Sequence, residues 1–129
     1  MRKIPWGDVA LWLPTLFLVY IFAQQGPSKF SDSSGWAKAF IAWHYPIWFR
    51  ILIGVMETSA AVLLLARRTA SIGAGLIALV MLGGMGTHVS RAHPEQVTSE
   101  VVHLALSLIV LWGRWPHVAR AISRWREPA

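Results

Sequence analysis

Five residues combine reactive side chains with a spacing that could build a polar site inside an otherwise apolar protein. They are Arg50, Glu57, His88, Glu100 and His103. Glu57 lies within the apolar stretch 46–66, and insertion scales place Asp, Lys or Arg at roughly 2.5–3.5 kcal/mol at the centre of such a helix. An ionisable group at that depth usually faces the interior of a helix bundle and marks a site or a pathway. Arg50 shares a helical face with Glu57 but stands about two turns away, so it is not an evident direct partner.

The other three residues lie on two later apolar stretches. Glu100 and His103 form a stripe with Ser107, and His88 follows a glycine-rich segment that begins at Gly83. Glycines let a neighbouring backbone or a flat ligand approach closely. The Glu-x-x-His spacing is typical of di-iron bundles, but these need a second such motif and further carboxylates, which the sequence lacks. We therefore predict no metal site.

Several ligands and several plain structural roles remain open for these residues. A quinone head group needs a hydrogen-bonding histidine or carboxyl, aromatic walls and access from lipid, and this set can supply all three. A non-covalent haem between His88 and His103 is a less favoured alternative. Glu57 could instead be a hydrogen-bonded core carboxyl, Arg50 could reach the lipid head groups, and the histidines could be interfacial or simply buried. No catalytic residue can be named, and the absence of cysteine excludes Fe–S clusters, thiol catalysis and cysteine-based zinc sites.

The elements that must position these residues are apolar helices. The chain has 129 residues, of which 55% are hydrophobic and only 14% charged, whereas soluble domains have about 25% charged residues. We predict an all-α fold, an integral membrane antiparallel four-helix bundle in a single domain (1–129). The four spans are expected at about 8–25, 46–66, 69–89 and 97–113.

Two further amphipathic segments are expected at the membrane surfaces. After a turn at Gly26-Pro27, Ser34 can cap a short interfacial helix from Trp36 to His44 in the first outer segment, lying as a lid over the bundle. The tail 116–126 alternates apolar and basic residues, as a helix on the inner membrane surface does.

The distribution of basic residues predicts the orientation. The net charge of +6 lies mainly at the ends of apolar stretches, which favours a lipid bilayer as partner and not nucleic acid. Eight basic residues fall on the side of the termini and of the second loop, and four fall on the other side. The eight are Arg2, Lys3, Arg67, Arg68, Arg114, Arg120, Arg124 and Arg126, and the four are Lys29, Lys38, Arg50 and Arg91. By the positive-inside rule both termini should be cytoplasmic, in what we expect to be a bacterial cytoplasmic membrane.

The sequence resembles the DoxX-like family of small four-helix membrane proteins. The resemblance rests on Gly26 to Phe30, on Gly54 to Glu57 with the run Thr58 to Leu65, on the turn Arg67 to Ala70, and on Gly83 to His88. It implies that Glu57 and His88 occupy positions that the family keeps polar. The start of the first helix departs from the family pattern.

The resemblance also implies a role beside membrane redox enzymes. We therefore predict an accessory subunit of a larger membrane complex, linked to oxidation–reduction or electron transport, and we favour a non-catalytic subunit over an enzyme. The alternative is a redox subunit that binds a quinone or another lipid-soluble carrier in the outer half of the bundle.

Overall fold

The computed structural model describes residues 6–90 and 97–126, and within these ranges it contains helices and no strand. The helices are α1 (Trp6–Ser28), α2 (Gly35–Ala42), α3 (Ile47–Leu63), α4 (Ala70–Ser90) and α5 (Val97–Arg126). The predicted all-α class is confirmed. Three of the helices, α1, α4 and α5, are long and apolar enough to cross a membrane. Helix α3 has 17 residues, which is the lower limit for a span.

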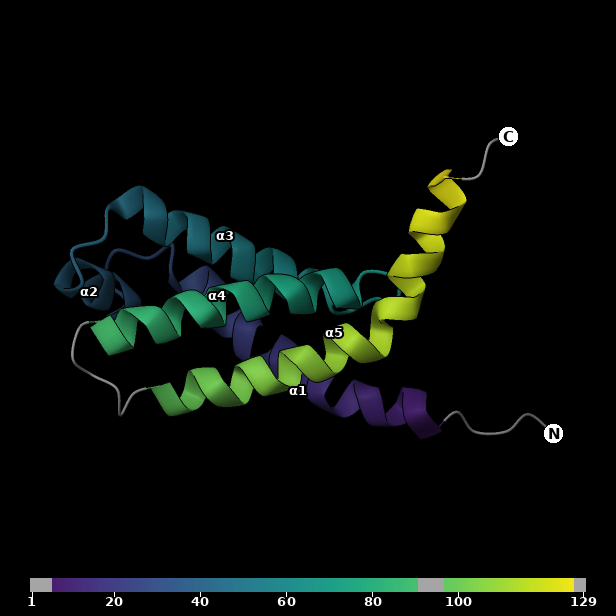
Figure 1. Cartoon of the computed structure of the whole chain (residues 1–129). Coiled ribbons are helices and arrows are strands. Elements are labelled where there is room, and N and C mark those ends of the chain that lie inside the picture. The colour runs from purple at the N-terminus through teal and green to yellow at the C-terminus, as the bar shows by residue number, and fades with distance from the viewer. Residues whose placement is uncertain (1–5, 91–96, 127–129) are drawn as a thin grey trace.

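The four long helices pack side by side with neighbouring directions reversed (Figure 1). Helix α1 contacts α3 and α5, and α4 contacts the same two helices from the opposite side. The short helix α2 packs on α3 at one end of the molecule, which we call the α2 end. The start of α1 and the turn between α3 and α4 lie at the other end, which we call the basic end (Figure 1).

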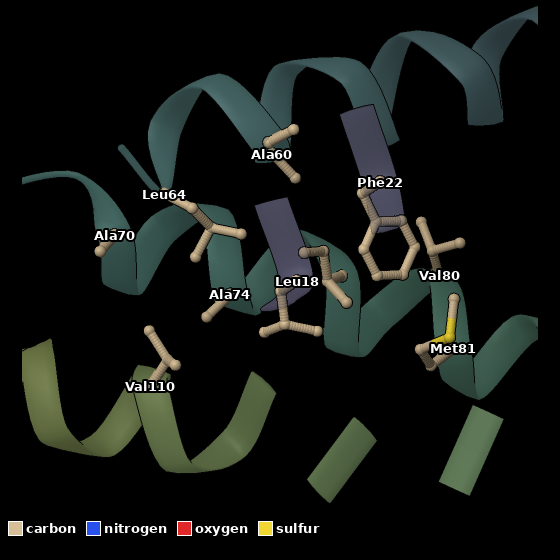
Figure 2. Close-up of a cluster of buried hydrophobic side chains, with 11 residues drawn as sticks. Leu18, Phe22, Ala60, Leu64, Ala70, Ala74, Val80, Met81 and Val110 are labelled. Carbon is tan, nitrogen blue, oxygen red and sulfur yellow. The ribbon is translucent and has the colours of Figure 1, made fainter. Parts of the chain in front are cut away.

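Small and branched apolar side chains form the core between the four long helices. Leu18 and Phe22 of α1 are fully buried between α3 and α4, where they meet residues such as Ala60 and Ala74 (Figure 2). Close packing of this kind suits a membrane protein, in which helices associate through van der Waals contact. The outer faces carry exposed apolar residues, among them Leu13, Tyr20, Val62, Leu79 and Leu82.

The structure differs from the expected boundaries at two points. Helix α1 continues through Gly26 and Pro27 to Ser28, and Gly26 brings this last turn against Thr58 of α3, where a Cβ atom would have no room. The tail 116–126 is not a separate helix, since it continues α5 through Pro116. Figure 1 shows this last part of α5 turned away from the bundle, as a proline inside a helix promotes.

Helix α2 lies close to its expected position. It runs from Gly35 to Ala42, and its N-cap is Ser34, whose hydroxyl oxygen accepts a hydrogen bond of 3.2 Å from the Ala37 amide. The helix ends at Ala42, two residues before His44, which has a left-handed backbone (φ 64°). This turn lets Tyr45 come back against the bundle, where its hydroxyl lies 2.8 Å from Thr87 Oγ1 of α4.

Candidate functional site

Glu57 has a direct partner that sequence reasoning missed. Lys29 follows α1 immediately, and its Nζ atom donates a hydrogen bond of 2.9 Å to Glu57 Oε2 in the middle of α3. The two side chains are only 3% and 2% exposed. The Lys29 ammonium also lies 3.9 Å from the centroid of the Trp36 ring, so α2 covers the pair with a cation–π contact. The buried carboxylate is thus matched by a buried cation.

Arg50 lies apart from this pair. Its Nη2 atom donates a hydrogen bond of 2.6 Å to Asp32 Oδ1, and its side chain is 4% exposed, while that of Asp32 is 92% exposed. Arg50 therefore connects the start of α3 to the segment before α2, and it does not line the cavity described below. Of the five residues singled out from the sequence, it is the one that the structure places outside the shared space.

His88 of α4 and Glu100 of α5 form a second buried couple at the α2 end. His88 Nδ1 lies 3.0 Å from Glu100 Oε1, although the direction is not that of a well-formed hydrogen bond. Ser99 Oγ donates a hydrogen bond of 3.2 Å to the other carboxylate oxygen. The edge of the Trp43 ring packs on His88, with ring centroids 5.4 Å apart. This couple holds the ends of two long helices together beneath aromatic side chains.

His103 of α5 lies one turn further along the same helix and is half-buried. Two phenylalanine rings of α1 pack on its imidazole ring, with centroids 6.1 Å away for Phe17 and 5.5 Å away for Phe22. The Phe22 ring approaches edge-on at 70°. His103 is thus fixed by aromatic contacts between α1 and α5, and it borders the same space as Glu100.

These groups surround a cavity of about 360 Å³, which we call the α2-end cavity. Four of the residues predicted from the sequence line it: Glu57, His88, Glu100 and His103. Aromatic side chains from α2, the segment after it and the start of α3 cover it: Trp36, Phe40, Trp43, Tyr45 and Phe49. Most of the remaining lining is apolar and comes from α3 and α4, for example Ile53, Met56 and Met81.

The α2-end cavity combines apolar walls with a few polar groups that come from different helices. This is the usual composition of a site for a small organic molecule, and such sites measure roughly 300–1,000 Å³. Lys29 and His88 can donate hydrogen bonds, and the two carboxylates can accept them. In residues 6–90 and 97–126, no three His, Asp or Glu side chains are grouped so that they could hold a metal ion.

Sequence reasoning missed Lys29 and Trp36 as members of this site. Lys29 directly follows an apolar stretch, where a lysine ordinarily reaches toward lipid head groups. The sequence predicts Trp36 in the interfacial helix, but its contact with Lys29 depends on how the segment between α1 and α2 folds back, which the sequence pattern does not reveal. One signal in the sequence could have identified Lys29. A buried Glu57 requires a cation as partner, and Lys29 is a basic residue directly after the first apolar stretch.

Comparison with known proteins adds the family. The DoxX-like family matches residues 13–110, which is most of the chain. The chain belongs to the DoxX-like family. The family match and the three helices able to cross a membrane together make it a DoxX-like membrane protein. The matched region includes every residue of the α2-end cavity.

A curated relative of this DoxX-like protein is the uncharacterised protein YdgD of Bacillus subtilis (strain 168). The two are 28% identical over 79 residues, which cover 57% of this chain and 69% of the relative. No solved structure matches the chain significantly.

Proposed function

We propose that this DoxX-like protein binds a lipid-soluble carrier of the quinone type in the α2-end cavity and takes part in a redox process of the membrane. The observation that carries the proposal is the pairing of an aromatic, mostly apolar cavity with two buried polar couples, Lys29–Glu57 and His88–Glu100. A quinone has a flat ring that packs on aromatic and apolar walls, and carbonyl oxygens that accept hydrogen bonds.

The polar groups are suited to both states of such a carrier. The Lys29 ammonium has three N–H donors, and the bond to Glu57 uses one of them. A carbonyl oxygen of the oxidised head group would accept a hydrogen bond from Lys29 or from the imidazole ring of His88. A hydroxyl of the reduced head group would donate to Glu57 or Glu100. The isoprenoid or alkyl tail would leave through the apolar wall.

We place the route of that tail between α3 and α4. Leu52 of α3 and Leu79 of α4 both line the cavity, and they are 45% and 60% exposed on the outer surface. They therefore border the cavity on one side and the outer surface of the bundle on the other. Entry from the lipid phase is what a water-insoluble ligand requires.

The test is to purify the full chain in mild detergent and measure binding of a short-chain benzoquinone and a short-chain naphthoquinone. Quenching of tryptophan fluorescence reports occupancy, because Trp36 and Trp43 line the cavity. His88→Asn should weaken binding by about tenfold, the value of roughly one hydrogen bond to the ligand. His117→Asn is the matched control, because His117 lies at the basic end. This variant should bind the quinones as tightly as the parent does. Equal binding by both variants would contradict the proposal.

The second candidate is the accessory subunit predicted from the sequence, without a ligand of its own. The observation that favours it is the large exposed apolar surface, which can pack against another membrane protein as well as against lipid. Purification in mild detergent separates the two candidates. If the protein forms a stable complex with other membrane proteins and that complex binds no quinone, the accessory role is supported and the carrier site is refuted.

We further propose that the basic end faces the cytoplasm and the α2 end faces the outer side of a bacterial cytoplasmic membrane. The support is the excess of basic residues on the side of the termini, eight against four. Reporter enzymes fused after Ala129 test this orientation. We expect activity from a reporter that works only in the cytoplasm, and activity from one that works only in the periplasm would reverse the assignment.

A further inference from the structure

A second hollow lies at the basic end, far from the α2-end cavity. It has a volume of about 510 Å³ and lies between the turn that joins α3 to α4 and the last part of α5. Its lining is dominated by cationic groups with one aromatic ring: Arg67, Arg68, Arg120, Arg124, His117 and Trp125. We call it the arginine hollow.

Within residues 6–90 and 97–126, a single carboxylate forms an ion pair with a residue of the arginine hollow. The acidic side chain closest in the structure is Asp8, which forms an ion pair with the buried Arg114 and a second one, at 2.7 Å, with Arg67. Within residues 6–90 and 97–126, Arg68 and Arg124 have no acidic partner. The other described acidic residues belong to the α2 end. The described lining of the hollow therefore carries excess positive charge, which favours binding of an anion from outside the protein.

The surroundings of the hollow indicate where that anion comes from. Trp125 lines the hollow and is 91% exposed, and Ile122 on the same turn of α5 is also exposed. Exposed tryptophan beside arginine is typical of the layer in which lipid head groups lie. The bend of α5 at Pro116 turns this segment away from the bundle (Figure 1), and its residues line the hollow together with Arg67 and Arg68 of the turn between α3 and α4.

We propose that the arginine hollow binds the phosphate group of an anionic phospholipid. A guanidinium group is planar and donates two parallel hydrogen bonds to phosphate, which makes arginine well suited to this ligand. Basic pockets beside membrane helices on the cytoplasmic side are a recurrent place for such head groups. Trp125 and Ile122 would contact the glycerol and the upper acyl region. This site is independent of the carrier proposed for the α2-end cavity.

Native mass spectrometry of the full chain in detergent tests the proposal directly. The probes are phosphatidylglycerol, phosphatidylcholine and inorganic phosphate, each added at the same series of concentrations. We expect the parent protein to retain one phosphatidylglycerol molecule in preference to phosphatidylcholine. The double variant Arg68→Gln/Arg124→Gln should weaken this retention by about tenfold or more. These two arginines are suitable because neither contributes to the ion pairs of Asp8.

Two controls make the result specific to the hollow. Lys38→Gln/Arg126→Gln removes the same net charge from residues that do not line the hollow, and it should leave retention unchanged. Arg68→Lys/Arg124→Lys keeps the charge and should lose less than the glutamine variant. Equal losses in the first control and the glutamine variant would overturn the proposal, because the effect would then be one of net charge. Binding of inorganic phosphate as tight as that of phosphatidylglycerol would overturn the assignment to lipid.

Discussion

The buried Lys29–Glu57 pair makes a sharp prediction about stability. At 2.9 Å, and with an effective dielectric constant of about 20, the attraction between the two charges is about 6 kcal/mol. Burial of each ion costs several kcal/mol, so the net contribution of the pair is small. Removing only one partner is different, because the other ion remains buried without compensation. We expect Lys29→Met to lower the free energy of unfolding by roughly 3–5 kcal/mol, and Glu57→Met to do the same.

The double variant Lys29→Met/Glu57→Met should recover most of this loss. Both ions are then replaced by apolar side chains of similar volume, so its stability should lie within about 1 kcal/mol of the parent or above it. The measurement is unfolding in mixed micelles as the fraction of denaturing detergent rises, followed by circular dichroism. Lys38→Met is the matched control, because Lys38 is exposed and takes part in no ion pair among the described residues, so its stability should stay within about 0.5 kcal/mol of the parent.

Two results from these single and double variants would refute the reasoning about the Lys29–Glu57 pair. If each single variant lost less than about 1 kcal/mol, the pair would not be buried as the structure has it. If the double variant lost as much as the two single variants together, the two charges would not interact.

Substitutions at three other positions test separate contacts. Gly26→Leu should lower the midpoint temperature of unfolding in detergent, because even a Cβ atom at this position would lie 2.7 Å from the backbone nitrogen of Thr58. A midpoint equal to that of the parent would mean that α1 and α3 are not in this contact. Asp8→Asn should also lower the midpoint, because it leaves the buried Arg114 without its carboxylate partner, and Asp8→Glu should restore part of the loss. Trp36→Ala should speed dissociation of a bound short-chain quinone in stopped-flow fluorescence, because it opens the cover of the α2-end cavity; an unchanged rate would show that α2 does not close it.

Hydropathy and turn chemistry were enough to predict most of the fold. Long apolar stretches separated by polar turns admit few arrangements other than antiparallel helices, and Ser34 marked the start of α2 correctly. The continuation of α5 through Pro116 was not predicted, because a proline after a tryptophan-rich span end ordinarily stops a helix. Here the helix bends instead of ending.

Part of the candidate site was predictable from the sequence, but its ion pairs and two of its lining residues, Lys29 and Trp36, were not. The cost of burying Glu57 showed that this residue faces an interior, and the same argument grouped it with His88, Glu100 and His103. Which cation meets Glu57 depends on how far the first helix extends, and the expected turn at Gly26 would have pointed Lys29 elsewhere. Partners joined by a tertiary contact across 28 residues leave no periodic signal in a single sequence.

The contact between the end of α1 and the middle of α3 also has a consequence for biosynthesis. Helix α3 is short and carries both Arg50 and Glu57, so on its own it is a poor substrate for the insertion machinery. Lys29 reaches the membrane earlier, at the end of a longer helix in which Asp8 is the single charged residue. We therefore expect α1 to remain beside the insertion channel until α3 has been synthesised. The two helices would then enter the lipid together as a hairpin, in which Lys29 and Glu57 neutralise each other.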